Sequence, residues 1–184
     1  MKIALIVAIA LIFGGCADAK QIGDSVTVYI VNDATAPPVI LCQARNLASK
    51  LFARAGVGIQ WRTSHHMDPP ASEDRAVVVH LMDRTPVNRK PGALGLSRPL
   101  EGVHITVFYD RVERLATGND LPTLLAYVMV HEITHLLQGE CRHSKSGIMK
   151  ANWIGSDYYD ITRDPFTEED VELIHRGLLR RKTD

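Results

Sequence analysis

The chain has 184 residues, of which 46% are hydrophobic and 23% are charged, a composition typical of a globular protein and not of a disordered one. Basic and acidic residues number 21 each, so the formal net charge is zero. This balance does not favour binding to nucleic acid or to a charged membrane surface, because both need a concentrated basic face. The length is enough for one domain of ordinary size, and we find no repeat, low-complexity stretch or interdomain linker.

The first nineteen residues have the pattern of a secretory signal peptide. Lys2 precedes an apolar run from Ile3 to Phe13, and Ala17-Asp18-Ala19 fits a small-residue cleavage site. The run is shorter than the about 20 residues that span a bilayer. We therefore expect cleavage near Lys20, export to the periplasm or the extracellular space, and no transmembrane segment in the mature chain. Lipidation of Cys16, which would tether the chain, is the alternative.

Cleavage would leave two cysteines, Cys42 and Cys141. An even number of cysteines in an oxidising compartment favours one disulfide. Two free thiols are the alternative, because the sequence does not give the distance between the residues.

The first half of the mature chain predicts strands around one helix. Residues 25–31 alternate and are β-branched, which indicates a strand. A helix is expected from Pro37-Pro38 to about Ala55, since its apolar residues recur at steps of three and four: Leu41, Ala44, Leu47, Ala48 and Leu51. Two further strands are expected over 57–62 and 75–82.

The second half predicts an irregular stretch, one strand and two helices. Residues 84–102 are rich in proline and glycine, 102–109 return to a strand, and helices are expected over 121–138 and 168–182. The first of these helices is apolar nearly all round, so it belongs inside the protein. The element order predicts an α/β (α+β) fold: a mixed, mostly parallel twisted sheet of about four to five strands packed on two long helices, with a C-terminal helix.

Polar residues on this apolar helix require an explanation. His131 and His135 lie four residues apart, so both imidazoles project from one side and can reach a single tetrahedral zinc ion at about 2.0–2.1 Å. Glu132 is placed to take a proton from a metal-bound water without binding the metal. The alternative is a pair of hydrogen-bonded core histidines with Glu132 in a salt bridge. His-Glu-x-x-His favours the zinc site.

A third ligand has several candidates. His143 follows His135 by eight residues, beyond a turn at Gly139, and Cys141 follows it by six. Glu168, Glu169 and Glu172 lie further on, where a helical carboxylate could serve.

The segment from Val130 to Met149 resembles the active-site segment of the metzincin clan of zinc metallopeptidases, and its matrixin-type members in particular. Those have His-Glu-x-x-His-x-x-Gly-x-x-His, often a serine after the third histidine, and then a turn with a methionine under the zinc. The resemblance implies the following roles in this chain: zinc ligands His131, His135 and His143, general base Glu132, and turn methionine Met149.

The upstream segments resemble the clan as well. Residues 55–61 look like its second strand, 93–97 like the edge strand that holds substrate, and 103–107 like the strand after it. Some metzincins also place a tyrosine after the methionine turn to steady the reaction intermediate, and Tyr158 and Tyr159 are the candidates here.

Two departures from the metzincin pattern concern the third ligand. Gly139 comes one residue late and His143 two residues late, while Cys141 occupies the usual place of the third histidine. A thiolate there could bind zinc. We prefer His143, because the His-Ser pair and the methionine turn follow it in the expected order.

These residues together predict an exported endopeptidase. It would bind one catalytic zinc ion, cleave peptide or protein substrates, and consist of a single metallopeptidase-like domain over 20–184. With a handful of residues between Lys20 and the first strand, no pro-domain is expected. The alternatives are an exported zinc-binding module without useful catalysis, and a gluzincin-like site with a downstream glutamate as ligand. No arrangement typical of a serine or cysteine hydrolase competes.

The remaining histidines predict structural roles. His65 and His66 fall in a polar stretch, His80 and His104 on strands, and His175 on the last helix. The sequence leaves the oligomeric state open.

Overall fold

The structure is a computed structural model that describes residues 24–65, 76–99 and 103–183. The predicted signal peptide (1–19), Cys16 and His66 lie outside the described residues. In chain order the elements are β1 (Asp24–Asn32), α1 (Pro38–Arg54), β2 (Val57–Ser64), β3 (Val77–Met82), β4 (Gly95–Ser97), β5 (His104–Phe108), α2 (Tyr109–Leu115), α3 (Leu121–Gln138), α4 (Asp157–Arg163) and α5 (Glu168–Thr183). Across the described ranges no helix has both the length and the apolar character needed to cross a membrane.

The five strands form one mixed sheet in the order β2-β1-β3-β5-β4. β1 pairs with both β2 and β3 in parallel, and β3 pairs with β5 in parallel. β4 alone is antiparallel, with Gly95 opposite Val107, and it forms one edge of the sheet. The predicted mixed, mostly parallel sheet is therefore confirmed, and so is the edge position of the segment around 93–97.

The central strands are apolar on both faces of the sheet. In β1, Val26, Val28 and Ile30 belong to the main core, while Tyr29 and Val31 belong to a smaller cluster. Because successive side chains of a strand point to opposite faces, the two clusters lie on opposite sides of the sheet. This explains why β1 becomes apolar at consecutive positions from Val28 to Val31, after its alternating start, and why β3 opens with three valines.

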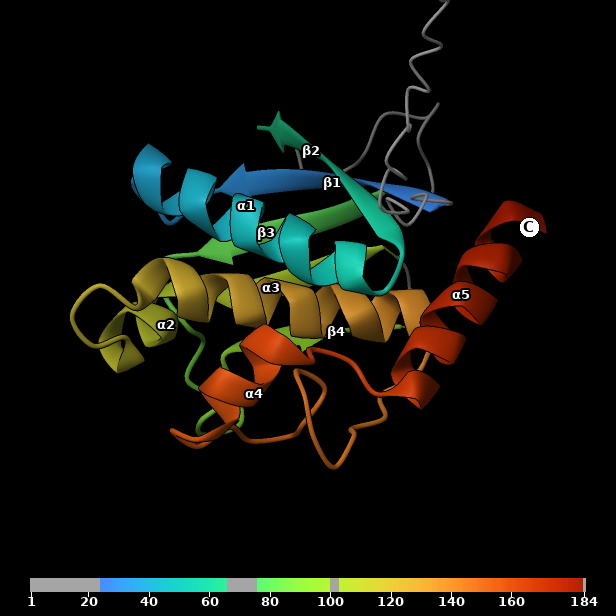
Figure 1. Cartoon of the computed structure of the whole chain (residues 1–184). Coiled ribbons are helices and arrows are strands. Elements are labelled where there is room, and N and C mark those ends of the chain that lie inside the picture. The colour runs from blue at the N-terminus through green and yellow to red at the C-terminus, as the bar shows by residue number, and fades with distance from the viewer. Residues whose placement is uncertain (1–23, 66–75, 100–102, 184) are drawn as a thin grey trace, which may run out of the picture.

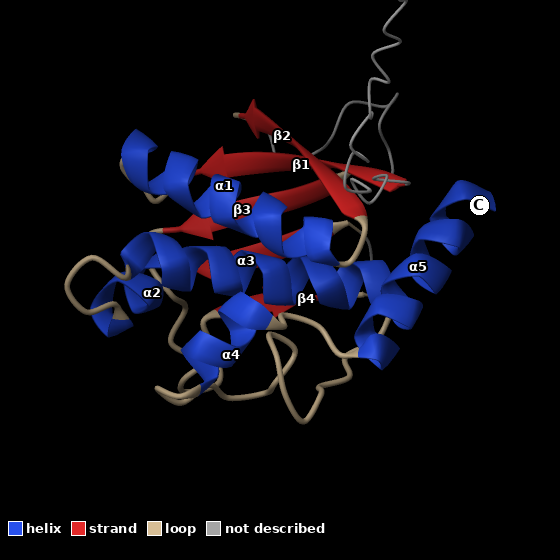
Figure 2. Ribbon diagram, viewed as in Figure 1, coloured by secondary structure: helices blue, strands red, loops and turns tan. Residues whose placement is uncertain are grey.

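The two long helices cover the same face of the sheet. Figures 1 and 2 show α1 and α3 side by side in front of the strands, with α5 crossing the far end of α3. Nearly every residue of α3 from Leu124 to Gln138 is buried. The helix lies among α1, α2, α5 and the sheet, as its apolar sequence predicts.

Two short helices were not predicted. α2 follows directly on β5 and begins at Tyr109, where the strand predicted over 102–109 ends, and α4 falls in the segment after Met149. Each has only seven residues, too few for a helical period to stand out. Each is instead stabilised by tertiary contacts, since Val112 and Ile161 are fully buried.

The cysteines do not form the expected disulfide. Cys42 lies on α1 and Cys141 on the loop after α3, and both are free and exposed. The prediction of a Cys42–Cys141 bridge is wrong, because the fold places the two thiols on separate elements, where each is free and exposed.

The contact between α3 and α5 depends on Gly177. A Cβ atom at this position would lie 1.6 Å from the Leu137 carbonyl oxygen, which is backbone and cannot rotate away. Inside a helix, alanine would otherwise be favoured over glycine by about 1 kcal/mol. Here we expect Gly177→Ala to lower the free energy of unfolding by about 2 kcal/mol or more, because the helices must separate.

Urea unfolding measures this difference. Gly155→Ala is the matched control, since a Cβ there meets nothing within 4 Å, and its effect should stay within about 0.5 kcal/mol. Equal stability of the Gly177→Ala variant and the unaltered protein would contradict the packing described.

Candidate metal centre

Three histidines meet at the C-terminal half of α3. His131 and His135 come from the helix and His143 from the loop that follows it, and their ligand atoms all lie within 4.8 Å of one another. The His143 ring stacks on His131 with the centroids 5.3 Å apart, and it meets His135 edge-on at 5.0 Å. The structure thus brings together the three histidines that the sequence selected, from two separate segments.

The first two rings are oriented by backbone carbonyls. Nδ1 of His131 lies 2.8 Å from the Ile148 carbonyl oxygen, and Nδ1 of His135 lies 2.9 Å from the Glu140 carbonyl oxygen. A carbonyl can only accept, so each Nδ1 carries a hydrogen and each Nε2 of a neutral ring is left with a lone pair.

The two lone pairs face each other. Nε2 of His131 and Nε2 of His135 are 3.1 Å apart, and two acceptors at this distance cannot hydrogen-bond. A cation between them resolves the conflict. Two imidazole nitrogens on one tetrahedral zinc ion would lie about 3.3 Å apart, given Zn–N distances of about 2.0–2.1 Å, so the pair fits zinc.

A proton is a poor substitute for the metal. Burial lowers the pKa of His131 to about 4, and it also lowers the pKa of His135, with a further contribution from the neighbouring His143. Burial likewise lowers the pKa of His143, and the Lys90 ammonium acts in the same direction. All three rings are therefore neutral near pH 7, the form in which imidazole binds metals.

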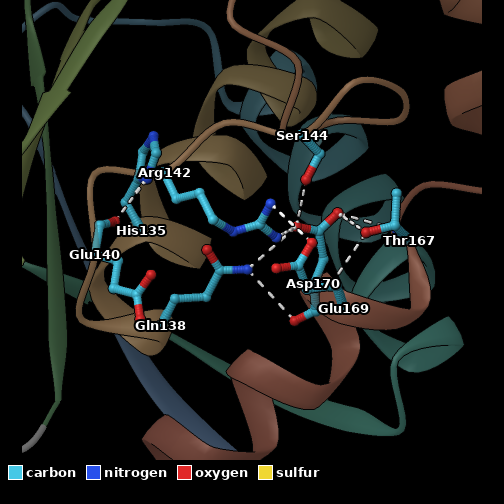
Figure 3. A network of polar contacts seen from close by, with 8 residues as sticks. All are labelled: His135, Gln138, Glu140, Arg142, Ser144, Thr167, Glu169 and Asp170. Atoms are coloured by element: carbon cyan, nitrogen blue, oxygen red, sulfur yellow. Dashed lines mark hydrogen bonds and ion pairs between the residues drawn. The ribbon is translucent and has the colours of Figure 1, made fainter.

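The end of α3 explains why His143 joins the group at its unusual spacing. The helix continues through Gln138 and stops at Gly139, whose φ of 73° is left-handed and suits glycine. The chain then turns back, so that the Glu140 carbonyl reaches the His135 ring (Figure 3). Cys141 is exposed, and it does not belong to the three-residue group.

Glu132 lies beside the histidines, against the edge strand. Its side chain is buried, and it accepts hydrogen bonds from the backbone and the side chain of Ser97 in β4. Burial raises the pKa of Glu132 to about 7, and the Ser97 hydrogen bonds oppose that rise. Gly95 makes room for the carboxylate, because a Cβ there would lie 2.7 Å from Glu132 Cγ.

A cleft of about 440 Å³ opens over this group. Residues 90–95 line one wall and 150–153 with Tyr158 the other, while Leu124, Val128, His131 and Glu132 of α3 lie between them. Arg111 of α2 donates to the carbonyl oxygens of Lys90 and Ala93 at 2.8 and 2.7 Å, which orders the first wall.

The second wall is attached to the histidines. Trp153 Nε1 donates to the Ile148 carbonyl oxygen at 3.1 Å, the same oxygen that orients His131, and the two rings meet edge-on at 5.6 Å. Met149 is fully buried next to this carbonyl, and its own carbonyl accepts from the Ser144 backbone at 2.8 Å. Sequence reasoning selected Met149 but missed Trp153, Ser97 and Gly95, whose roles depend on contacts between distant segments.

The other candidates lie away from the centre. Glu168, Glu169 and Glu172 are exposed, and the last two pair with Arg142 and Arg176 respectively. None of the three belongs to the histidine group. The alternative with a glutamate ligand therefore finds no support within the described ranges.

The remaining histidines and tyrosines divide as follows. His80 contacts Asp33 at 2.8 Å and His175 contacts the Ala55 carbonyl oxygen at 2.8 Å, in agreement with structural roles. Tyr158 lines the cleft and stacks on Tyr127, whereas Tyr159 is 70% exposed.

Comparison with known proteins supports the fold. No family model matches the chain, and no curated protein matches it. Solved structures do: an archaemetzincin from Methanopyrus kandleri aligns with a TM-score of 0.52 at 16% identity, over 89% of this chain and 99% of that one. A zinc-dependent peptidase from Methanocorpusculum labreanum aligns with a TM-score of 0.52 at 14% identity, over 81% of this chain and 99% of that one. At these identities the likeness establishes the shared fold.

The buried carboxyl of Glu132 makes a stability prediction for the metal-free protein. Its folded pKa of about 7 exceeds the ordinary value of 4.5, so its contribution to stability is complete below pH 4.5 and is lost as the pH rises through 7. Glu132→Gln does not titrate. We expect the free energy of unfolding of this variant, relative to that of the unaltered protein, to rise between pH 4.5 and 7. The difference should reach up to about 3 kcal/mol at pH 8.

Urea unfolding at pH 5 and pH 8 with a chelator present measures the gain. His131 acts in the opposite sense, since its lowered pKa removes stability as the pH falls from 6.5 to 4, but it is present in both proteins and cancels. Glu113→Gln, at an exposed glutamate of α2, is the control for the loss of a carboxylate from the surface. A Glu132→Gln difference that is flat with pH would rule out a buried carboxyl with a raised pKa.

Proposed function

We propose that the protein is a zinc-dependent endopeptidase that hydrolyses peptide bonds. One observation carries the proposal: two neutral imidazoles present their Nε2 lone pairs to each other at 3.1 Å, with a third histidine beside them, and His131 and His143 of this group line an open cleft. Its fold neighbours, an archaemetzincin and a zinc-dependent peptidase, support the same class of activity.

His131, His135 and His143 would bind the ion. Three protein ligands and an open fourth position are typical of catalytic zinc sites, while structural sites are closed by four. Zinc in such a site supplies a Lewis acid that lowers the pKa of bound water to about 7 and polarises a carbonyl group. His143 is exposed and lines the cleft together with His131, so the centre would be accessible to a substrate.

Glu132 would be the general base. It is the only carboxylate among the described residues that line the cleft, and it directly follows His131, in the turn of helix between the two helical ligands. In this role the carboxylate takes a proton from the attacking water and transfers it to the leaving amine nitrogen. Ser97 and Gly95 support the role, because they orient and accommodate the carboxylate.

The edge strand β4 would bind the substrate backbone. β4 pairs with β5 on one side and is the last strand of the sheet, so an extended peptide can add along its free side. The residues before β4 form one wall of the cleft, and Arg111 orders them. An extended peptide bound there would pass over Glu132 and the histidines, which favours cleavage within a chain.

Export remains part of the proposal. Its support is the pattern of residues 1–19, a positive start, an apolar run and a small-residue cleavage site, with lipidation of Cys16 as the alternative form. In an oxidising compartment the exposed thiols of Cys42 and Cys141 would be open to modification.

The activity is tested with a library of mixed peptides. We expect cleavage that a chelator abolishes and zinc restores. Glu132→Gln should retain about one zinc ion per chain and lose at least about 100-fold in kcat, because a general base contributes about 10² to 10⁴. His131→Ala and His135→Ala should lose the metal. Retained zinc without cleavage by the unaltered protein would favour the alternative, a zinc-binding module.

Gly95→Ala tests the placement of the carboxylate without changing it chemically. A methyl group at 95 must displace Glu132, so kcat should fall while the zinc content is unchanged. Gly155→Ala, which meets nothing within 4 Å, is the matched control. Equal rates for Gly95→Ala and Gly155→Ala would show that the Glu132 position seen here is not the one used in catalysis.

A further inference from the structure

His143 lacks the support that the other two histidines have. His131 and His135 each donate to a backbone carbonyl, which fixes the ring plane and the tautomer. Within the described part of the chain, neither ring nitrogen of His143 has a hydrogen-bond partner, and the residue is exposed on a loop. Apart from the contacts with the other two rings, its position therefore depends on the backbone to which it is attached.

That backbone is anchored immediately on both sides of His143. Arg142 Nη2 donates to Asp170 Oδ1 at 2.7 Å, and Ser144 Oγ donates to the same oxygen at 2.6 Å (Figure 3). The side chain of Asp170 is 1% exposed, so these contacts are shielded from water and are charge-assisted. One carboxylate oxygen thus accepts hydrogen bonds from both sequence neighbours of His143.

The second oxygen of Asp170 has a separate role. Oδ2 accepts from the backbone and the hydroxyl of Thr167, at 3.0 and 2.7 Å, and the Asp170 backbone donates to the Thr167 hydroxyl at 3.2 Å. This is the capping arrangement at the start of α5. Oδ1 is therefore not needed for the helix end, and helix capping alone does not account for the contacts with Arg142 and Ser144.

We propose that Asp170 is a positioning residue for the third metal ligand: by binding Arg142 and Ser144 through Oδ1, it keeps the longer loop after α3 in the conformation that presents His143 to His131 and His135. The inference rests on the proposed zinc site. It accounts for the departure of this chain from the regular metzincin spacing, because a loop with extra residues has more conformations to sample. If only a fraction of molecules presents His143, the apparent dissociation constant for zinc rises by the inverse of that fraction.

The Ser144 backbone connects the same loop to the methionine turn. Its N–H donates to the Met149 carbonyl oxygen at 2.8 Å, next to the carbonyl that orients His131. Ser144 thus links the loop to the turn through its backbone and to α5 through its hydroxyl. Loss of the hydroxyl leaves the first link intact, which makes Ser144→Ala a mild and specific change.

The test measures zinc affinity by competition with a chromophoric chelator. We expect Asp170→Asn to raise the zinc dissociation constant by about 10- to 100-fold, as is usual for residues that orient a metal ligand, and Ser144→Ala to raise it several-fold. Thr167→Val is the matched control, because it removes the hydroxyl on the Oδ2 side and leaves Oδ1 unchanged. It should lower thermal stability of the metal-free protein without changing zinc affinity.

A double-mutant cycle shows whether the effect passes through His143. His143→Ala should itself weaken zinc binding strongly. In the His143→Ala background, Ser144→Ala and Asp170→Asn should have no further effect on the dissociation constant. In the Co²⁺-loaded protein, Asp170→Asn should move the visible spectrum towards that of His143→Ala, whereas Thr167→Val should leave it unchanged.

Three results would overturn the proposal. The first is unchanged zinc affinity in both Ser144→Ala and Asp170→Asn. The second is a loss of zinc affinity in Thr167→Val as large as that in Ser144→Ala, which would show that zinc affinity responds to stability in general. The third is that Ser144→Ala or Asp170→Asn weakens zinc binding in the His143→Ala background as much as it does in the unaltered protein. If Asp170→Asn does not fold, Ser144→Ala decides by the same criteria. If His143→Ala binds zinc like the unaltered protein, the proposed ligand set itself is wrong, a result distinct from the three above.

Discussion

The opposition of two nitrogen lone pairs is the constraint on which the rest of the site depends. His131 and His135 use Nδ1 to donate to carbonyls, and their Nε2 atoms are left 3.1 Å apart in a buried setting. Burial makes a proton costly there, as the pKa of about 4 for His131 indicates. A metal ion satisfies both nitrogens without that cost. The neighbouring elements then have distinct roles. The turn at Ile148 orients the His131 ring, the loop after α3 carries His143, and β4 accommodates the Glu132 carboxylate.

The groups that orient the site come from outside the helix that carries it. The carbonyls of Glu140 and Ile148 belong to the loop and the turn after α3, Ser97 belongs to the edge strand, and Asp170 belongs to α5. The site therefore exists only in the folded chain, although three of its residues are adjacent on one helix. This arrangement also opposes stability in the metal-free state, because the Glu132 carboxyl and the imidazoles of His131 and His135 are withdrawn from water without a cation. Metal binding and folding should accordingly be coupled.

The sequence could predict features that depend on residues close together in the chain, and it could not predict contacts between distant segments. The alternation in β1, the apolar steps in α1 and the all-round apolar α3 are local patterns, and they predicted the sheet and both long helices. The roles of His131, Glu132 and His135 could be predicted in the same way, since a helix alone sets their spacing. The contacts of Glu132 with Gly95 and Ser97, and of Asp170 with the residues beside His143, join segments that are far apart in the chain and have no local signature. The expected disulfide was wrong for the same reason, because two cysteines in a sequence carry no information on their separation.

The proposed metal centre and the cleft beside it share a single backbone oxygen. The Ile148 carbonyl accepts from His131 on one side and from Trp153 on the other, and Trp153 lines the cleft. A substrate that moves the second wall would displace Trp153, and through this carbonyl it would change the hydrogen bond that sets the basicity of a metal ligand. The first wall has the corresponding connection, since β4 carries the serine that hydrogen-bonds Glu132. Both walls of the cleft are thus in direct contact with groups of the proposed chemistry, one with a ligand and one with the base.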